Sequence, residues 1–445
     1  MQFKRYVGET IRLKEKYGKN IGQVVKGLDL TPIENQYKWL EEESKKVVEK
    51  LKISLRKNKI GAEVFLGGSF AKRTMVKKQV HDIDVYVRFD QRYEELSSIL
   101  ERVVHNAFGK NRDIKIDKIH GSRDYFRLNF SSYLSFEIIP VISIKHPREA
   151  RNVTDLSYFH VKYFKKYIAR HPEFNNEVAL AKTFCRAQGV YGAESYIQGF
   201  SGYALECLIL YYGSFLKMIR ALSKAEKRIV IDPEKQYGKK DNLLILMNES
   251  KLQSPIILID PTWKERNALA ALSRESFEVF KKAAGEFIRR PSKEYFIFHA
   301  IDKKELEKLA LENKAELLHL NISTDKQAGD IAGTKLKKFF EFLSLELIKE
   351  FEIFSKAFQY DCDESAEIYF VLKAKKEIVK IGPPLKMEKH ANAFRKEHKN
   401  VFKKNGFLHA RVKTSGSARE CINKFLKTSW KKMKEMSITG IKILD

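Results

Sequence analysis

The chain has 445 residues, which at about 100–200 residues per domain predicts several domains. It holds 84 Lys and Arg against 57 Asp and Glu, a formal net charge of +27, and 43% of its residues are hydrophobic. This composition excludes a mostly disordered chain, and the charge predicts a polyanionic partner, either nucleic acid or an anionic membrane surface.

The first part of the chain is predicted to be a mixed α/β region. A polar–apolar helix covers Pro32–Lys57, and a clearly alternating strand covers Asp82–Phe89. A second helix is predicted near Glu94–Phe108. The other predicted strands are Ala62–Leu66, Asp113–Ile119, Tyr125–Phe130 and Leu134–Ile139.

From Thr154 to Lys224 the apolar residues recur with the period of a helix. The clearest helices are Asn176–Gln188 and Gly202–Leu222, and Gly189 is well placed to end the first of them. From about Arg290 the pattern reads β-α-β-β-α-β, an order typical of a ferredoxin-like fold with an added piece. Its predicted strands are Ala315–Ile322, Ile353–Gln359, Glu367–Ala374 and Phe407–Thr414, and its helices are Thr334–Phe351, His390–His398 and Ala418–Trp430.

Cysteine spacing and the apolar runs narrow the class of protein. The four cysteines lie far apart with no CxxC pair, which argues against structural zinc and against a disulfide framework. The charged N-terminus, MQFKRYVGET, does not resemble a signal peptide. The most apolar stretch, Cys207–Met218, is shorter than the roughly 18 residues of a membrane span. We therefore expect a cytoplasmic protein with no inserted membrane segment.

The stretch that carries chemistry is Gly67-Gly-Ser-Phe-Ala-Lys-Arg-Thr74, directly after a predicted strand. A strand that ends in Gly-Gly-Ser lets the backbone approach a phosphate closely, because glycine has no Cβ. Gly68 permits that approach, Ser69 adds a hydroxyl donor, and Lys72 and Arg73 add positive charge. The turn is therefore predicted to bind the phosphates of a nucleotide.

Asp82 and Asp84 lie two residues apart on the next predicted strand, so both carboxylates leave the same face. Paired carboxylates repel each other unless a cation lies between them, and Mg²⁺ is the natural cation for oxygen ligands. Two such ions about 3.5–4 Å apart activate an attacking hydroxyl and stabilise a leaving pyrophosphate. The opposite face must be the core face, and it carries Ile83, Val85, Val87 and Phe89.

Glu137 is the best candidate for a third carboxylate. It is a lone acid in an apolar strand, on the face opposite Phe136 and Ile138. A DxD pair alone would more simply be a solvated edge strand or a chance match. The Gly-Ser turn upstream and the isolated Glu downstream together favour nucleotidyl transfer.

These motifs resemble the nucleotidyltransferase superfamily that includes DNA polymerase beta and the poly(A) polymerases. Further blocks resemble the archaeal-type (class I) CCA-adding enzymes, in family order over nearly the whole chain, and do not look like the class II pattern of bacteria and eukaryotes. The blocks are Lys182–Glu194, Gly199–Tyr203, Tyr212–Phe215, Asp260–Asn267, Arg290–Ser292 and Gly382-Pro383.

The resemblance implies an α+β multidomain fold. It would have a nucleotidyltransferase (polymerase-beta-like) mixed-sheet head in residues 1–150, a helical central domain in 151–285, and a ferredoxin-like α/β body with a basic tail in 286–445. The implied activity is template-independent addition and repair of the 3′-terminal CCA of tRNA from CTP and ATP, with release of pyrophosphate. Two Mg²⁺ ions are the expected cofactors, tRNA is the expected partner, and a homodimer is compatible with the sequence.

The family's metal and triphosphate residues carry over to matching positions. Asp82 and Asp84 match the magnesium-binding pair, and Glu137 falls where the family usually has Asp, as a metal ligand or a base. Ser69 and Lys72 fall at triphosphate-contacting positions. Lys72 stands where the family typically has Arg, so the bidentate phosphate contact is either lost or passes to Arg73.

Four more positions match nucleotide contacts. His160, Lys182 and Tyr191 match contacts to the nucleotide, and Arg266 matches a base-reading arginine. Each has a simpler interpretation, respectively an interfacial histidine, an exposed lysine, a tyrosine packed at a helix end and a surface arginine that binds phosphate.

Two other functions remain open at this point. One is a poly(A) polymerase or another terminal RNA nucleotidyltransferase, which would share the three carboxylates but not the Tyr191 and Arg266 blocks. The other is a non-catalytic RNA-binding relative, against which the intact carboxylates argue. The prediction that the sequence favours is a tRNA nucleotidyltransferase.

Overall fold

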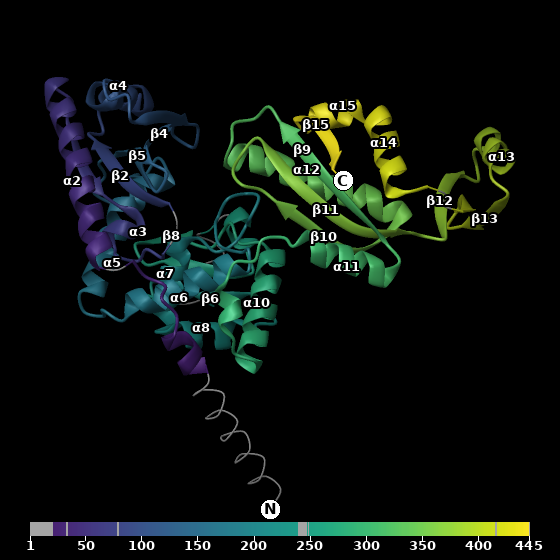
Figure 1. The fold of residues 1–445 in the computed structure, drawn as a ribbon, viewed down its shortest axis with the longest axis horizontal. Helices are drawn as coiled ribbons and strands as arrows, with labels where there is room; N and C mark the ends of the chain where they lie inside the picture. The colour runs from purple at the N-terminus through teal and green to yellow at the C-terminus, as the bar shows by residue number, and fades with distance from the viewer. Residues whose placement is uncertain are drawn as a thin grey trace, which may run out of the picture. The chain divides into compact units, whose positions relative to one another are not determined.

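The structure, a computed structural model, describes residues 21–32, 34–77, 80–238, 247, 249–413 and 416–444. Its contacts divide the chain into two units (Figure 1). The first unit comprises the residues up to Ala193 together with Ile197–Phe298, and the second comprises Glu194–Tyr196 with His299–Asp445. The domain boundaries predicted at 150/151 and 285/286 stay predictions.

A five-stranded mixed sheet forms the N-terminal part of the first unit. Its strand order is β1-β2-β5-β4-β3, with β2 and β5 parallel and the other neighbours antiparallel. The strands are β1 (Ala62–Leu66), β2 (His81–Phe89), β3 (Lys115–Ile119), β4 (Tyr125–Ser131) and β5 (Leu134–Ile142).

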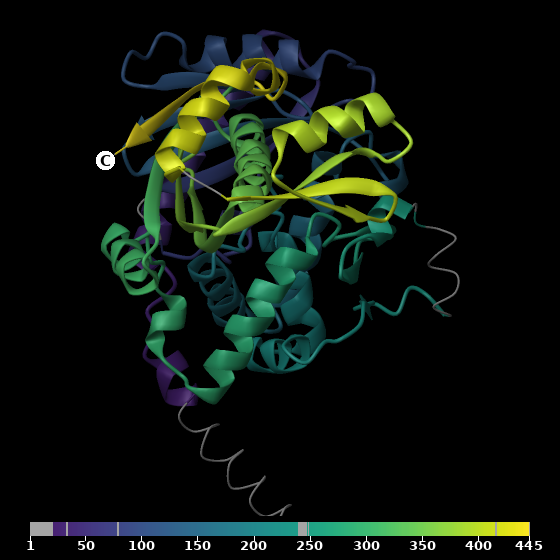
Figure 2. The same cartoon turned by 90° about the vertical axis from the view of Figure 1, so that its right-hand side faces the viewer.

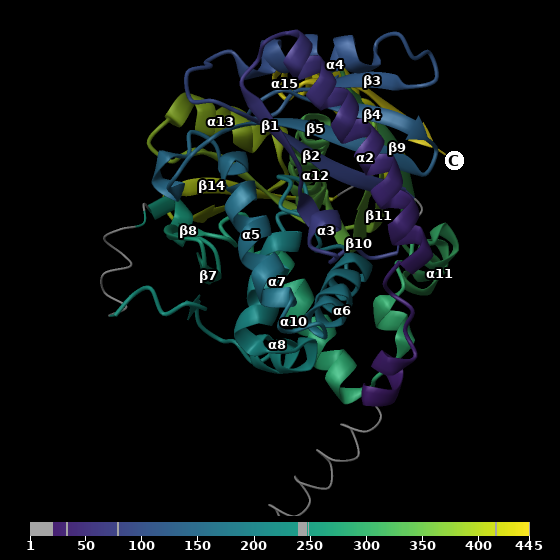
Figure 3. The ribbon, with the colours of Figure 1, turned by 90° about the vertical axis from the view of Figure 1, so that its left-hand side faces the viewer.

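Two helices, α2 (Glu34–Lys57) and α4 (Leu96–Phe108), pack against one face of this sheet (Figure 3). Buried residues recur along α2 every three or four positions, as a one-sided helix requires. Along β2, Ile83 and Val85 are fully buried in the same core. Because side chains alternate along a strand, the even-numbered residues of β2 project from the sheet's other face.

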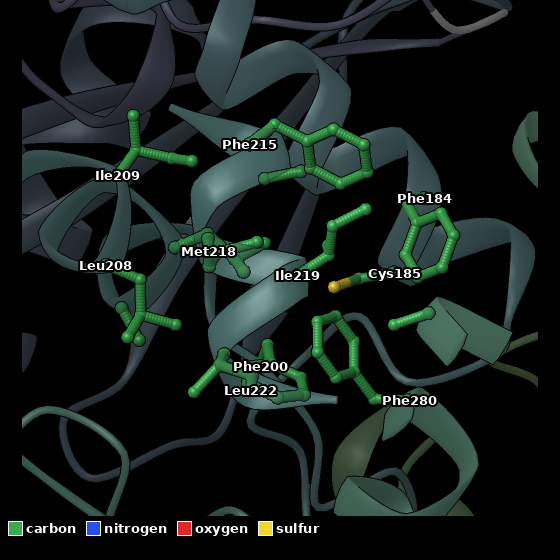
Figure 4. Close-up of a cluster of buried hydrophobic side chains, with 14 of the residues drawn as sticks. Phe184, Cys185, Phe200, Leu208, Ile209, Phe215, Met218, Ile219, Leu222 and Phe280 are labelled. Atoms are coloured by element: carbon green, nitrogen blue, oxygen red, sulfur yellow. The ribbon is translucent and has the colours of Figure 1, made fainter. Parts of the chain in front are cut away.

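A helical region follows in the same unit. Its helices are α5 (Ser157–Ile168), α6 (Phe174–Ala187), α7 (Gly202–Tyr212), α8 (Phe215–Leu222) and α10 (Arg274–Arg289). Phe184, Phe200, Phe215 and Phe280 meet in its core without solvent exposure (Figure 4). A small sheet adjoins these helices and consists of β6 (Ile229–Ile231), β7 (Ile256–Asp260) and β8 (Trp263–Asn267).

Short 3₁₀ turns complete the first unit. They are η1 (Pro147–Glu149), η2 (Val153–Leu156), η3 (Glu249–Leu252) and η4 (Lys293–Phe296).

The prediction of one helix over Gly202–Leu222 is wrong, because the chain breaks between α7 and α8. Gly213 adopts a left-handed φ of 77° there, and the Ser214 side chain accepts a hydrogen bond from the Lys217 N–H. A glycine followed by a serine is an ordinary signal for one helix to end and the next to begin. The prediction for Gly189 is confirmed, since it follows α6 with a φ of +68°.

The second unit contains a four-stranded antiparallel sheet in the order β10-β11-β9-β15. That order, with helices after the first and third strands, is the ferredoxin-like arrangement, so this part of the prediction is confirmed. The strands are β9 (Glu316–Thr324), β10 (Phe351–Gln359), β11 (Ser365–Ala374) and β15 (Ile438–Leu444), and the helices are α11 (Lys303–Asn313), α12 (Asp330–Glu350), α14 (Ala418–Thr428) and α15 (Trp430–Glu435).

The fourth strand of this fold is β15 and not the predicted segment Phe407–Thr414. That segment is β14 (Phe407–Lys413), and Thr414 lies outside the described residues. It belongs to a separate sheet, β12-β14-β13, with α13 packed against it (Figure 2). The predicted helix His390–His398 is α13 (Glu388–Glu397) and also belongs to this separate sheet, whose other strands are β12 (Glu377–Pro384) and β13 (Asn400–Lys404).

The α+β fold class is confirmed by these mixed and antiparallel sheets with their separate helical region. Several element boundaries differ from the predicted ones by a few residues, and β5 continues through Pro140 to Ile142, past the predicted end at Ile139. Strand β4 pairs with β5 only as far as Ile138, so Pro140 lies where β5 has a single neighbouring strand. Among the described residues, no helix is long and apolar enough to cross a membrane.

Candidate active site

Two carboxylates stand on the face of β2 opposite the core. Asp82 and Asp84 are half-buried, as the alternation of the strand predicts. The Ser135 hydroxyl, on the neighbouring strand β5, donates a hydrogen bond of 2.7 Å to Oδ1 of Asp82. This contact restricts the rotation of the Asp82 carboxylate within the site.

Glu137 lies beside Asp84. The two residues are direct partners across the parallel strands β2 and β5, so their side chains share a face. On its other side Glu137 faces Arg127 of β4, whose Nη2 donates to Oε1 at 2.8 Å. The third predicted carboxylate is therefore next to the aspartate pair, but it also has an arginine as a partner.

The aspartate pair suits Mg²⁺ in its chemistry. Magnesium takes oxygen ligands and is commonly held by one or two carboxylates together with substrate phosphates. Within the described ranges, no group of three or more His, Cys, Asp or Glu side chains is placed to hold a metal by itself.

The Gly67-Gly68-Ser69 turn lies directly against Asp84. The Gly67 N–H donates to the Asp84 carbonyl oxygen at 2.9 Å, and Gly68 has a left-handed φ of +56°. A Cβ on Gly68 would come within 1.6 Å of Oδ2 of Asp84. Only glycine fits between this backbone and the carboxylate, so the turn lies against the face of β2 that carries Asp84.

The two basic residues after this turn point to different partners. Lys72 is only 7% exposed, and its Nζ donates to Oε2 of Glu206 at 2.5 Å. Arg73 is exposed and pairs with Glu34 and Glu41 of α2 at 3.1 and 3.0 Å. Of the two, Lys72 is therefore the one held in the interior of the first unit, while the Arg73 guanidinium is engaged on α2.

Lys182 joins Lys72 on the same carboxylate. Its Nζ lies 3.1 Å from Oε1 of Glu206 and donates to the Thr74 carbonyl at 2.9 Å. The residue is 2% exposed, so the simpler interpretation as an exposed lysine is wrong. Burial lowers the pKa of Lys182, and the Glu206 carboxylate acts in the opposite direction.

A second buried cluster is centred on Asp260 at the end of β7. Nε2 of His160 lies 3.1 Å from its Oδ2, the Arg266 Nη1 donates to Oδ2 at 2.6 Å, and the Tyr203 hydroxyl donates to Oδ1 at 2.8 Å. Burial alone would raise the pKa of Asp260, but His160 and Arg266 hold it well below its usual range. Burial also lowers the pKa of His160.

Ring contacts join the two clusters. His160 stacks on Tyr203 with a centroid separation of 3.9 Å. The Lys72 Nζ lies 5.7 Å from the Tyr203 ring centroid, and the Arg266 guanidinium lies 5.4 Å from it. Contacts therefore run without interruption from the turn beside Asp84 to Arg266.

Tyr191 lies at the edge of this arrangement. It is half-buried, and the Arg186 guanidinium lies 4.8 Å from its ring centroid. A Cβ on Gly202 would come within 2.9 Å of the Tyr191 hydroxyl and 3.4 Å of Cε of Lys182. Tyr191 and Lys182 therefore both border the start of α7.

The first unit contains cavities near its N-terminal sheet. One of about 750 Å³ opens between α2, β1 and α5, and none of the predicted site residues lines it. Another, of about 500 Å³, is lined by Lys72 and Arg73 among others. Neither of these two cavities is lined by Asp82 or Asp84, so cavity size does not locate the carboxylates.

Comparison with known proteins assigns the family. Residues 176–297 match the model of the second domain of tRNA nucleotidyltransferases. The CCA-adding enzyme of Nanoarchaeum equitans is 30% identical over 373 residues, which cover 81% of this chain and 88% of that protein. The chain belongs to the CCA-adding enzyme family. The CCA-adding enzyme of Saccharolobus shibatae is 31% identical over 301 residues, which cover 67% of this chain and 66% of that protein.

Two solved structures match this CCA-adding enzyme at much lower sequence identity. The Cid1 poly(U) polymerase superposes with a TM-score of 0.49 at 13% identity, over 64% of this chain and all of that one. A cytoplasmic RNA terminal U-transferase gives a TM-score of 0.48 at 12% identity. The family assignment rests on the sequence comparisons.

Glu206 and the role of Asp260 are missing from the sequence prediction. Glu206 is the single acid in the apolar helix α7, and Asp260 ends the apolar strand β7. A lone acid in an apolar element is the signal that led to Glu137, and applied throughout it would have found both. Their partners come from distant parts of the sequence, so the pairing itself is visible only in the fold.

Proposed function

We propose that this enzyme adds and repairs the 3′-terminal CCA of tRNA without a nucleic-acid template, using CTP and ATP and releasing pyrophosphate. The observation that carries the proposal is the contact between Gly68 and the Asp84 carboxylate. It puts a backbone turn suited to phosphate beside a carboxylate pair suited to Mg²⁺, in a chain that belongs to the CCA-adding enzyme family.

At the metal face, Asp82 and Asp84 would bind two Mg²⁺ ions. Magnesium, when bound, neutralises triphosphate charge and favours ionisation of the attacking 3′-hydroxyl. Ser135 keeps the Asp82 carboxylate oriented through its hydrogen bond. Glu137 would act beside Asp84 as a third ligand or a base, and Arg127 would hold its carboxylate in place.

The triphosphate would lie along the turn, with the Gly68 backbone and Ser69 as donors. Lys72 and Lys182 share one carboxylate, so with both lysines protonated their cluster with Glu206 would carry one net positive charge in a buried place. A buried surplus charge is costly unless an anion approaches it. This surplus supports a polyphosphate as the ligand.

The base would be read at the Asp260 cluster. Arg266 is four-fifths buried and fixed to Asp260, which is unlike a surface arginine that binds phosphate. His160 and Tyr203 form an adjacent stacked pair, and Tyr191 would border the nucleotide from the side of Lys182.

The three predicted domains would divide the work of catalysis, nucleotide binding and tRNA binding. We propose residues 1–150 as the catalytic head, 151–285 as the nucleotide-binding domain, and 286–445 as the part that contacts the acceptor and T arms. The net charge of +27 supports contacts to many phosphates, which suffice for an RNA of fixed shape. The proposed location is the cytoplasm.

The experiment supplies tRNA lacking its last three nucleotides with CTP alone, ATP alone, or both. The proposal expects two added nucleotides with CTP alone and three with both nucleotides. With ATP alone it expects no continued extension. A long ladder with ATP alone would instead identify a poly(A) polymerase. Binding of tRNA without any addition would identify a non-catalytic relative.

A further inference from the structure

The carboxylate of Glu206 is shared by three donors from two separate parts of the first unit. Lys72 and Thr74 come from the segment that follows β1, whereas Lys182 comes from α6. The Thr74 hydroxyl donates to Oε1 at 2.7 Å, in addition to the two ammonium contacts. Glu206 itself is 1% exposed, so both of its oxygens are fully engaged inside the protein.

One further hydrogen bond connects Thr74 to the Gly67-Gly68-Ser69 turn, which is proposed to bind phosphate. The Thr74 N–H donates to the Ser69 carbonyl at 2.9 Å, which closes the turn. At the other end of the turn, Gly67 and Gly68 lie against Asp84. The turn is thus fixed at one end by β2 and at the other by Glu206.

The charge of Glu206 matters as much as its shape. Burial raises the pKa of Glu206, but the ammonium groups of Lys72 and Lys182 outweigh burial and lower it to about 2. The group is therefore a carboxylate at neutral pH. Without that charge, two buried ammonium groups would face each other with no counter-charge between them.

We propose that Glu206 is a positioning residue for nucleotide binding: its negative charge holds Lys72 and Lys182 together and fixes the Gly67–Thr74 turn beside them. The inference rests on the proposed function, since it takes the turn and the two lysines to bind the triphosphate. It adds a residue outside the nucleotide contacts that determines how well those contacts are made.

Two substitutions at this position separate charge from shape. Glu206→Gln keeps the shape, but whichever way the amide is turned, its NH₂ group faces an ammonium group. Glu206→Asp keeps the charge and shortens the side chain. We expect the Kd for CTP to rise about tenfold or more in the Gln variant, because hydrogen bonds to charged groups are lost. The Asp variant should bind CTP better than the Gln variant does.

Direct CTP binding is measured together with the KM for CTP, the Kd for tRNA and the melting temperature. The matched control is Glu177→Gln, a glutamate of α6 whose carboxylate accepts the Phe215 N–H at 2.7 Å, and within the described part of the chain no site residue pairs with it. The control should bind CTP as the wild type does. A positioning role raises the Kd and KM for CTP and leaves tRNA binding unchanged, whereas general destabilisation would weaken both.

The inference is overturned if the Gln variant binds CTP as well as the wild type, or better than the Asp variant. If the Gln variant does not fold, Lys72→Met combined with Glu206→Gln removes the repulsion. That double variant carries one more positive charge than Lys72→Met alone, which by itself would favour CTP binding. Loss of the carboxylate that fixes Lys182 and Thr74 should nevertheless make it bind CTP more weakly than Lys72→Met alone, and equal or tighter binding would overturn the inference. A wild type that adds no CCA would contradict the proposed function instead.

Discussion

Asp84 on β2 and Glu137 on β5 face each other as partners across two parallel strands, next to the turn at Gly68. The relationship brings together carboxylates that are 53 residues apart in the sequence (137 − 84). It defines the place where the reaction would occur, and the first predictions concern the residues that form it.

Replacing either aspartate of β2 should stop nucleotide addition. Asp82→Asn and Asp84→Asn should lower kcat by roughly a hundredfold or more, the scale found when a group that stabilises transition-state charge is removed. Binding of tRNA, measured by gel shift, should be unchanged, because only the metal face is altered. Appreciable turnover in magnesium by either variant would contradict the two-metal assignment.

Substitutions at Glu137 distinguish charge from geometry. The proposal needs an ionised group beside Asp84, so Glu137→Gln should lower the rate of addition far more than Glu137→Asp. Single-turnover rates on a tRNA ending in its first C measure the effect. If the Gln variant is as active as the wild type, Glu137 serves only as the partner of Arg127 and the third carboxylate lies elsewhere.

Gly68→Ala tests the close approach of the turn to Asp84. The added Cβ would collide with Oδ2, so we expect activity to fall strongly along with metal binding. Gly189→Ala is the matched control, because Gly189 also has a left-handed φ but nothing lies within 4 Å of the added Cβ. The control should lose about 1–2 kcal/mol of stability while activity is kept. Equal loss of activity in both variants would show that backbone strain alone is responsible.

Arg266→Ala tests base reading. Cytosine N3 and adenine N1 accept hydrogen bonds, whereas uracil N3 and guanine N1 carry hydrogens, and a guanidinium offers only donors. Loss of such a buried pairing costs about 1–3 kcal/mol, or one to two decades of discrimination. The variant should incorporate less CTP and ATP, and its preference over UTP and GTP should narrow. If incorporation falls equally for all four nucleotides and the preference is unchanged, Arg266 contacts only phosphate and does not read the base.

The acid stability of the protein should depend on Glu206. Its pKa is about 2 in the folded protein against the usual 4.5, so its ionised form stabilises the folded state fully above pH 4.5. That contribution is lost as the pH falls from about 4.5 to about 2. The free energy of unfolding of Glu206→Gln, followed by urea titration at several pH values, should therefore vary less over this range. Identical slopes would contradict a low pKa for Glu206.

Local pattern explains which parts of the fold the sequence predicts. Alternation along β2 is enough to place Asp82 and Asp84 on one face, and Gly189 marks the end of α6 by its own conformation. Strand β15 escapes prediction because Gly440 interrupts a short alternating run, and its identity as a strand comes from pairing with β9.

Long-range pairing explains what the sequence does not predict in the site. Family resemblance singles out Lys72 and Lys182, but nothing in the local sequence shows that they share one carboxylate. Their partner Glu206 is 134 residues from Lys72, and the two residues meet only because the turn after β1 lies against α7. The Asp260 cluster likewise joins Asp260 to His160 across 100 residues.

The most direct test of the central claim is the sequence of the 3′ ends that the enzyme makes. A tRNA lacking its last three nucleotides is incubated with all four nucleoside triphosphates and magnesium, and the product ends are sequenced. The account predicts that the extended molecules end in CCA, with few U or G residues and no further extension. Products that carry oligo(A) or U tails in place of CCA would contradict it.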